Sequence, residues 1–347
     1  MRDGGNTPEN KKCMKYIDIY KLLKNSINYT ESQITIPEVI EIRNYDFTSN
    51  NCHILPDNTV DNTLNGYDTR CETGIMHEML DIHDCDLKDN ISFRYHVFSP
   101  IGTEKAKEIV LMLYNAAIST RIHTNPQRFF WSGLQTYYDV IQFIENYKSG
   151  FHPFITPDAG IDVFAYSIGV FLSEVLFITN HNNYFDKSKL VMFCGGPVFN
   201  RMSPVSKSIL DSQANVVIYS YIIEHLDSHL KKDEKLRHYL CERPEGISFR
   251  SMLNYGLMSD FREERLRSMA ERLLAVALRQ DTIVPAYEIV NTLQGKYRDI
   301  PVRVDIHDLP YPYKHEDPFP TLEKISEEID AEFRRIFDSI GKFLFDS

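Results

Sequence analysis

The chain has 347 residues, of which 43% are hydrophobic and 25% are charged, a balance typical of a globular protein with a sizeable core. Its formal net charge is −11, and no stripe of Lys and Arg is present, which argues against a nucleic-acid partner. No apolar run approaches the roughly 20 residues that span a bilayer, residues 1–10 resemble no signal peptide, and the six cysteines form no C-x-x-C pair. We therefore expect a cytoplasmic protein without a membrane span.

The first 90 residues form a polar, irregular N-terminal extension. Residues 34–37 and 39–42 are typical of a short strand region that Pro37 interrupts, and residues 49–66 are rich in Asn, Asp and Thr, as loops are. We expect this extension to pack on the core that follows.

Strand-like and helix-like segments alternate from residue 91 onward. The strands are predicted at 91–98, 109–114, 161–166, 190–194, 273–278 and 302–306. The helices are predicted at 132–150, 169–180, 285–293 and from about 321 to the end, where Ile325, Ile329, Phe333, Ile336 and Ile340 form one apolar stripe. This alternation predicts a three-layer α/β/α fold with a mostly parallel sheet and helices on both faces.

The segment 199–270 breaks the alternation, since it is charged, mostly helical in pattern and too long for an ordinary connection. It predicts an inserted helical cap. The predicted organisation is therefore an N-terminal extension (1–90), the first half of the core (91–198), the cap (199–270) and the second half of the core (271–347).

The stretch 163–170 is the most informative part of the sequence. An apolar strand leads into Ser167, the small residues Ala165 and Gly169 flank the serine, and a helix-like segment leaves it. This pattern is typical of a nucleophile elbow, a cramped strand–turn–helix junction that exposes a serine oxygen.

Two further polar residues follow later strands, where sites form in open α/β sheets. Asp281 follows the strand 273–278, and His315 follows the strand 302–306. Asp211 and Asp186 are weaker alternatives to Asp281 as the acidic residue of such a site. His307, which lies directly after the strand, is an alternative to His315 as the base.

Residues 90–345 resemble the α/β-hydrolase superfamily of serine hydrolases. The resemblance depends on the A-x-S-x-G elbow at 165–169, on Asp281 after a late strand with a proline four residues on, and on His315 after the final strand. From residue 130 onward the chain also resembles an uncharacterised bacterial branch of that superfamily, a domain-of-unknown-function family.

The resemblance implies a mechanism. Ser167 is the expected nucleophile, His315 the general base and then acid, and Asp281 the residue that fixes the imidazole. The resemblance favours His315 over the alternative histidine as this base, because it implies a histidine in a loop some residues beyond the strand. The expected oxyanion donors are the backbone N–H groups of Ile168 and Ala116.

Two stretches depart from the family's pattern. The loop after Tyr114 lacks the usual glycine-rich run, and the interval 115–161 offers only residues 128–131 as a strand where a helix, a strand and a helix are expected. The sheet is therefore expected to lack a strand, or to have a shortened one, in this interval.

The sequence favours neither a metal site nor a phosphate site. His225 and His229 lie four residues apart without the glutamate of H-E-x-x-H, so packing histidines are favoured. A Cys/His group lacks paired zinc-ligand spacing; its members are Cys52, His53, Cys71, His77, His83 and Cys85. Residues 195–197 are typical of a tight turn. We expect neither a metal nor an organic cofactor.

The sequence thus predicts a serine hydrolase that cleaves an ester, thioester or related acyl bond of a small-molecule substrate. The alternative is a non-catalytic module on a degenerate hydrolase fold that binds a small molecule or a protein. A metal-dependent enzyme using the Cys/His group is a third, weaker hypothesis.

Overall fold

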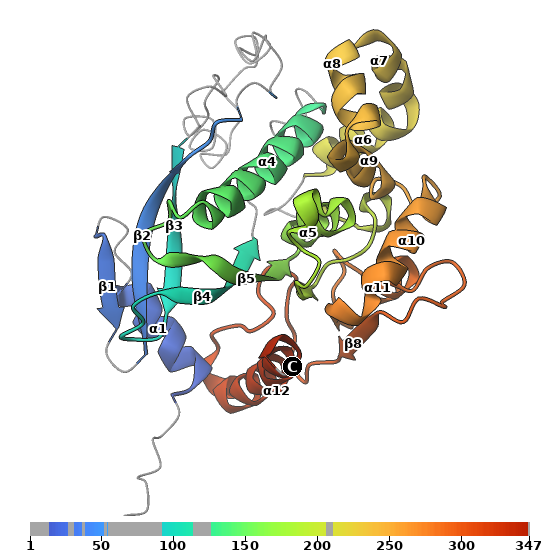
Figure 1. The fold of residues 1–347 in the computed structure, drawn as a ribbon. Coiled ribbons are helices and arrows are strands. Elements are labelled where there is room, and N and C mark those ends of the chain that lie inside the picture. The colour runs from blue at the N-terminus through green and yellow to red at the C-terminus, as the bar shows by residue number, and fades with distance from the viewer. Residues whose placement is uncertain are drawn as a thin grey trace, which may run out of the picture.

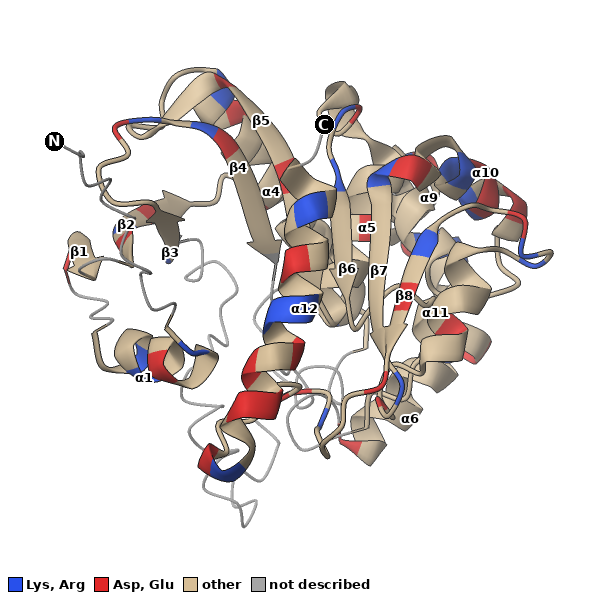
Figure 2. Cartoon of the chain, turned by 90° about the horizontal axis from the view of Figure 1, so that it is seen from below, with Lys and Arg blue, Asp and Glu red and all other residues tan. Residues whose placement is uncertain are grey.

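The centre of the molecule is a parallel five-stranded sheet. The computed structural model describes residues 14–26, 31–36, 39–51, 54, 92–113, 126–205 and 211–345. The strands lie in chain order and are β4 (Ala106–Leu113), β5 (Ile155–Tyr166), β6 (Leu190–Phe193), β7 (Leu273–Leu278) and β8 (Arg303–His307). Each connection therefore crosses one face of the sheet, and the carboxyl ends of all five strands lie at one edge (Figure 2).

The middle strands are apolar throughout because both of their faces are buried. Side chains alternate along a strand, so Leu190 and Met192 of β6 belong to one hydrophobic cluster, and Val191 and Phe193 belong to the other. All six residues of β7 are buried in the same alternating way. A continuous apolar run is what a strand between two helical layers requires.

Helices cover both faces of the sheet. The first face carries α4 (Arg128–Lys148), α5 (Ile168–Thr179) and α11 (Ala286–Leu293). The second face carries α12 (Ser326–Phe345), which crosses in front of the sheet in Figure 2 while α4 and α5 lie behind it. The predicted three-layer α/β/α fold is confirmed, and the predicted apolar stripe of α12 packs on the sheet.

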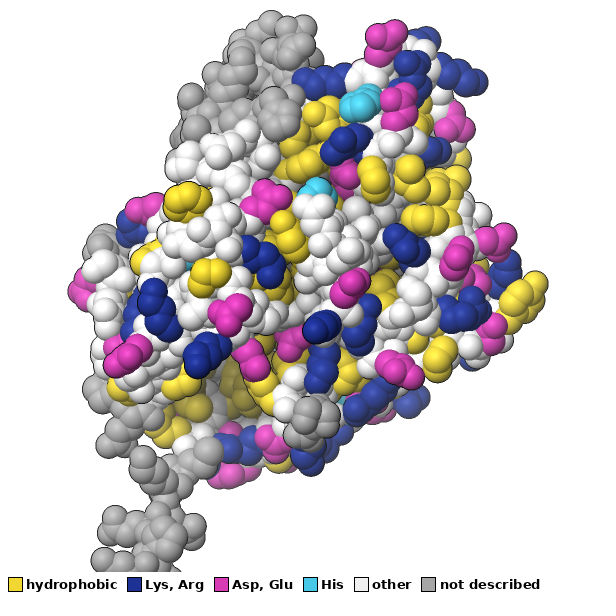
Figure 3. Space-filling model, in the orientation of Figure 1, with side chains coloured by type: hydrophobic (Ala, Val, Ile, Leu, Met, Phe, Trp, Pro, Cys, Tyr) yellow, Lys and Arg dark blue, Asp and Glu magenta, His cyan; other side chains and the backbone are white. Residues whose placement is uncertain are grey.

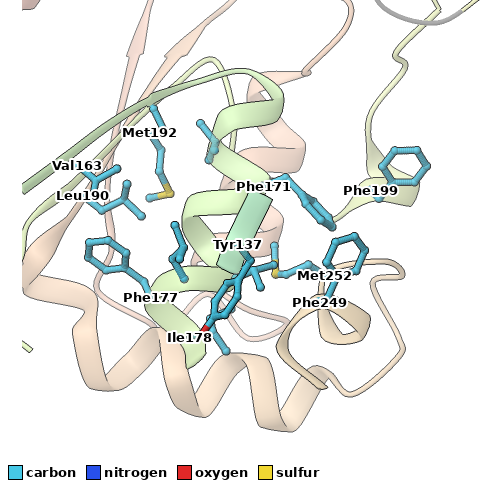
Figure 4. Packing of buried hydrophobic residues seen from close by; sticks show 14 of the residues in the cluster. Tyr137, Val163, Phe171, Phe177, Ile178, Leu190, Met192, Phe199, Phe249 and Met252 are labelled. Carbon is cyan, nitrogen blue, oxygen red and sulfur yellow. The ribbon is translucent and has the colours of Figure 1, made fainter. Parts of the chain in front are cut away.

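The helix that begins after Ser167 is held in the larger cluster. In Figure 4, Phe171 and Phe177 of α5 lie among Tyr137 of α4, Leu190 of β6 and Phe249. The Phe171 and Phe249 ring centroids are 5.1 Å apart with nearly perpendicular ring planes. Because α5 is packed on several sides, its first residue is fixed relative to the sheet.

The connection between β6 and β7 contains a group of short helices. They are α6 (Ser212–Ser220), α7 (Leu226–Lys232), α8 (Glu234–Arg237), α9 (Pro244–Ser251) and α10 (Ser259–Met269), and α6 to α9 gather at the upper right of Figure 1. Turns of π-helix follow α6 and α8 as η5 (Tyr221–His225) and η6 (His238–Glu242). Two short 3-10 turns also belong to this connection, η4 (Phe199–Arg201) and η7 (Ala270–Arg272). Two others lie outside it: η3 (His181–Asn183) precedes β6, and η8 (Glu323–Ile325) precedes α12. The segment is helical, as its pattern predicts.

The described residues of the N-terminal part form a small sheet and a helix. The elements are α1 (Tyr16–Ser26), β1 (Gln33–Ile36), β2 (Ile40–Thr48) and β3 (Ser92–Ser99), and the strands pair antiparallel in the order β1-β2-β3. The helix α1 packs against α12, where the Tyr16 and Phe333 ring centroids are 4.6 Å apart and the Tyr16 N–H donates to Asp330.

Three sequence predictions differ from the structure. Residues 128–131, suggested as a strand, form the first turn of α4, because Phe129, Phe130 and Trp131 are all buried beside the helices that α4 packs on. The helix predicted at 132–150 therefore begins earlier, at Arg128. The run 109–114 is continuously apolar, as is typical of a central strand, but it lies in β4, the edge strand among the described strands, and its Met112 is 70% exposed.

In the described parts of the chain, no helix has the length and apolar character needed to cross a membrane. On the face shown in Figure 3, acidic and basic side chains are interspersed.

Candidate active site

Ser167 lies at the turn between β5 and α5 in a strained conformation. Its φ and ψ are 55° and −123°, a region that costs a non-glycine residue on the order of 1–3 kcal/mol. Two backbone bonds hold the turn: the Ser167 N–H donates to the Phe193 carbonyl at 3.0 Å, and its carbonyl accepts from Val170 at 2.9 Å. Such strain persists where the surroundings over-determine it, as at functional turns.

A glycine on the neighbouring strand end gives this turn its room. A Cβ added to Gly195 would lie 2.4 Å from Val170 Cγ2 and 3.0 Å from the Ser167 carbonyl oxygen. Position 195, the second residue after β6, must therefore be glycine for the serine turn to approach β6 this closely.

The structure brings Ser167, His315 and Asp281 together in one hydrogen-bonded chain. Ser167 Oγ lies 2.6 Å from His315 Nε2, and His315 Nδ1 lies 2.7 Å from Asp281 Oδ2. The three residues follow β5, β8 and β7, so the shared carboxyl edge of the parallel strands places them side by side.

The Asp281 carboxylate is buried and fully engaged. Oδ1 accepts from the N–H groups of Ile283 and Val284, each at 2.9 Å, while Oδ2 faces His315. A carboxylate in this position accepts the Nδ1–H of the imidazole, so Nε2 is left to accept the Ser167 hydroxyl proton. This is the tautomer that a histidine needs in order to act as a base toward a serine.

Cys194, the residue directly after β6, was not among the predicted site residues. Its thiol donates to the Asp281 carboxylate, and burial, together with the Asp281 charge, raises the pKa of this thiol well above its usual range. Its φ is 50°, a left-handed value that a non-glycine residue seldom adopts. The sequence signal that could have identified Cys194 is its position directly after a strand, the same criterion that singled out Asp281.

The loop that carries His315 is anchored on either side of the histidine. Tyr313 accepts a hydrogen bond from the Gln280 N–H at 2.7 Å. Phe319 lies in an aromatic cluster with Phe193 and Phe333, with ring centroids 6.2 and 5.2 Å away. The loop is thus attached both to the strand end that bears Asp281 and to the sheet.

The alternative residues lie elsewhere. His307 is the last residue of β8, and its Nδ1 accepts from Arg335 of α12 at 2.8 Å. Asp211 accepts from the Ala214 N–H at the start of α6, and Asp186 accepts from the Asn180 amide at 2.6 Å. None of the three appears in the hydrogen-bonded chain of Ser167.

The structure describes one of the two expected oxyanion donors, Ile168, and not the other, Ala116. Ile168 is the first residue of α5, a position whose N–H has no partner within its own helix. Ala116 lies outside the described residues. The N–H of Ile168 is therefore the donor whose place beside Ser167 is defined.

The other sequence signals form no ligand cluster where the structure describes them. His229 Nδ1 is in hydrogen-bond contact with Gln127 at 3.0 Å and with Tyr221 at 3.1 Å, which agrees with a packing role. Gly196 has φ 121° and forms the tight turn expected of residues 195–197. The Cys/His group (Cys52, His53, Cys71, His77, His83 and Cys85) lies outside the described residues, and within those that are described no three His, Cys, Asp or Glu side chains could hold a metal ion.

Comparison with known families and structures gives the following matches. A family model described as "Family of unknown function (DUF6051)" matches residues 14–114 and 113–345. No curated protein matches the chain.

Several solved structures are similar to this chain at low identity. Carboxyl esterase 2 from the fungus Tuber melanosporum is 13% identical, with 73% of this chain and 82% of that chain covered and a TM-score of 0.40. A thermostable esterase from Pseudomonas putida is 8% identical, with 95% and 90% covered and a TM-score of 0.45. Brefeldin A esterase, a bacterial homologue of human hormone-sensitive lipase, is 10% identical, with 94% and 84% covered and a TM-score of 0.42.

Proposed function

The chain belongs to the family of unknown function DUF6051, and we propose that it is a serine hydrolase of the α/β-hydrolase type. The bond it cleaves is an ester, thioester or related acyl bond in a small molecule. The observation that carries this proposal is the pair of hydrogen bonds from Ser167 to His315, 2.6 Å, and from His315 to Asp281, 2.7 Å.

The geometry supports a two-step reaction. Ser167 Oγ attacks the substrate carbonyl while His315 Nε2 takes the hydroxyl proton, and the proton then passes to the leaving alcohol or thiol. A water molecule, deprotonated by the same nitrogen, attacks the acyl-enzyme ester, and its proton returns Ser167 to the hydroxyl form. The Ile168 N–H stabilises the oxyanion in both steps.

Burial makes Asp281 suited to support this base. The Asp281 side chain is 0% exposed and the His315 side chain is 2% exposed, so the imidazolium that forms during the attack faces a carboxylate with little water between them. The carboxylate stabilises the positive imidazole and keeps the ring in one orientation.

The helices between β6 and β7 are proposed to act as the cap over this site, with residues 199–270 as their boundary. The connection starts at the strand end that carries Cys194 and Gly195, so its helices are connected directly to the edge where Ser167 lies. On this proposal, the cap sets which acyl group reaches the serine.

Covalent labelling with a fluorophosphonate tests the proposed function. Wild type is expected to label and Ser167→Ala to remain unlabelled, because the reagent reacts with an activated serine. Ser228→Ala is the matched control, since Ser228 lies on the exposed side of α7 and donates to the His225 carbonyl. Equal labelling of wild type and Ser167→Ala would overturn the assignment, and absence of labelling in wild type would favour the non-catalytic binding module.

A further inference from the structure

Tyr166, the residue before the serine, makes two separate contacts with His315. Its ring stacks on the imidazole, with centroids 5.6 Å apart and planes 16° from parallel. Its hydroxyl donates to the backbone carbonyl of the same histidine. One side chain at the end of β5 therefore contacts both the ring and the backbone of the residue that faces Ser167.

The histidine needs such support because of where it lies. His315 belongs to the connection between β8, which ends at His307, and α12, which starts at Ser326. Residues in irregular connections lose backbone freedom when a reaction requires one geometry, whereas a residue at the end of a packed strand is already fixed. Tyr313 and Phe319 anchor the loop, but the contacts described for them do not reach the imidazole of His315.

We propose that Tyr166 is a positioning residue that holds the His315 imidazole in line with Ser167 Oγ. The inference rests on the proposed function and names a further residue for the same site. Tyr166 and Ser167 are consecutive, so the strand end that orients the nucleophile also orients its base. The sequence pattern of the elbow assigns no role to this position.

The stacked arrangement is compatible with the hydrogen bonds of the histidine. Both ring nitrogens donate or accept in the plane of the imidazole, and a ring parallel to that plane leaves the 2.6 Å bond to Ser167 and the 2.7 Å bond to Asp281 undisturbed. An aromatic face at this distance also favours the positively charged imidazole that forms when Ser167 loses its proton.

Two substitutions separate the contacts. Tyr166→Phe keeps the ring and removes the hydroxyl, and Tyr166→Leu removes both contacts. We expect Tyr166→Phe to lower kcat about 5- to 10-fold, as loss of one hydrogen bond does, and Tyr166→Leu to lower it further, with KM nearly unchanged in both. Turnover is measured on the ester substrate that wild type hydrolyses best.

Tyr147→Phe is the matched control. The Tyr147 hydroxyl also donates to a backbone carbonyl, that of Ala159 near the start of β5, at the other end of the strand from Ser167. Both substitutions therefore remove one hydroxyl from a tyrosine that contacts a backbone carbonyl. We expect Tyr147→Phe to keep the wild-type kcat.

A measurement on the histidine itself distinguishes positioning from a general loss of stability. The His315 Nδ1 proton of wild type is expected as a slowly exchanging, downfield proton resonance, and in Tyr166→Phe this resonance is expected to broaden through exchange with water while the fold remains intact. Tyr147→Phe is expected to leave it unchanged.

The possible failures are distinguishable. If wild type labels with fluorophosphonate while Tyr166→Phe keeps the wild-type kcat and the wild-type proton resonance, this inference is wrong and the proposed function stands. If wild type neither labels nor turns over any ester, the proposed function is wrong, and the inference falls with it.

Discussion

Ser167 Oγ lies 2.6 Å from His315 Nε2, although 148 residues separate the two in the sequence. The parallel sheet brings them together, because β5 and β8 end at the same edge and their following turns meet there. Asp281 follows β7, one of the two strands between them, and completes the contact.

The two candidate histidines should differ sharply in their effect on activity. His315→Gln is expected to lower kcat by about 10⁶, since it removes the base that faces Ser167. His307→Gln is expected to keep activity, because His307 faces Arg335 on α12. Ester turnover of both variants measures this difference. A larger loss in His307→Gln than in His315→Gln would contradict the assignment.

The thiol of Cys194 should contribute to the orientation of Asp281. Cys194→Ala removes a donor from the Asp281 carboxylate, and we expect kcat to fall by about 5- to 10-fold, the usual effect of one hydrogen bond. Cys194→Ser retains a donor of similar size and is expected to recover most of the activity. Equal activity of the Ala variant and wild type would show that this donor is dispensable.

Gly195 should be required by the serine turn. Gly195→Ala forces its Cβ against Val170 and the Ser167 carbonyl, so Ser167 must move and kcat is expected to fall at least about 10-fold. Overpacking of this kind lowers the free energy of unfolding by roughly 1–3 kcal/mol. Activity assays and urea unfolding measure the two effects.

Gly341→Ala is the control for that substitution. Gly341 lies in α12 and an added Cβ would meet no atom within 4 Å. Replacing it should raise the free energy of unfolding by about 1 kcal/mol, as alanine favours a helix over glycine, and should leave kcat unchanged. An intact kcat in Gly195→Ala would show that the turn tolerates a larger neighbour.

His152 should make stability depend on pH. It is 7% exposed, its Nδ1 accepts from the Phe154 and Ile155 N–H groups, and Nε2 bonds Tyr95 at 2.8 Å. Burial first, and Lys105 second, lower the pKa of His152 to about 4. The folded protein therefore holds this histidine neutral where the unfolded chain, with a histidine pKa of about 6.5, takes up a proton.

The sign of the effect follows from linkage. The unfolded state binds more protons between about pH 6.5 and pH 4, so the free energy of unfolding falls as the pH falls through this range and is fully restored above it. The loss from this residue is about 2 kcal/mol between pH 7.5 and pH 5. Urea unfolding at the two pH values measures it, and His152→Gln should show a smaller difference. An unchanged difference would contradict the role of His152.

The sequence was most informative where a feature is local. The strand before Ser167, the small flanking residues and the helix after it all lie within about ten positions, and the structure shows this strand–turn–helix junction with Ser167 at φ 55°. The buried strands were recognisable for a similar reason: β6 and β7 lie between two helical layers, so every residue in them is apolar.

Pattern alone was misleading where tertiary packing decides. Phe129, Phe130 and Trp131 are a run of aromatic residues that resembles a strand, yet they begin α4 because three neighbouring helical positions can all be buried at a crowded helix end. The apolar run of β4 resembles a central strand, but the strand at the edge of a sheet can also be apolar.

By itself, the sequence determined the fold class and the residue types at the strand ends, because side-chain periodicity and turn chemistry depend on near neighbours along the chain. Only the tertiary structure decided which partners meet. It placed His315, and not His307, against Ser167, and it brought the Cys194 thiol to Asp281 and the Tyr166 ring to His315. These contacts join different strand ends, and their distances are set by the sheet and the loops rather than by sequence spacing.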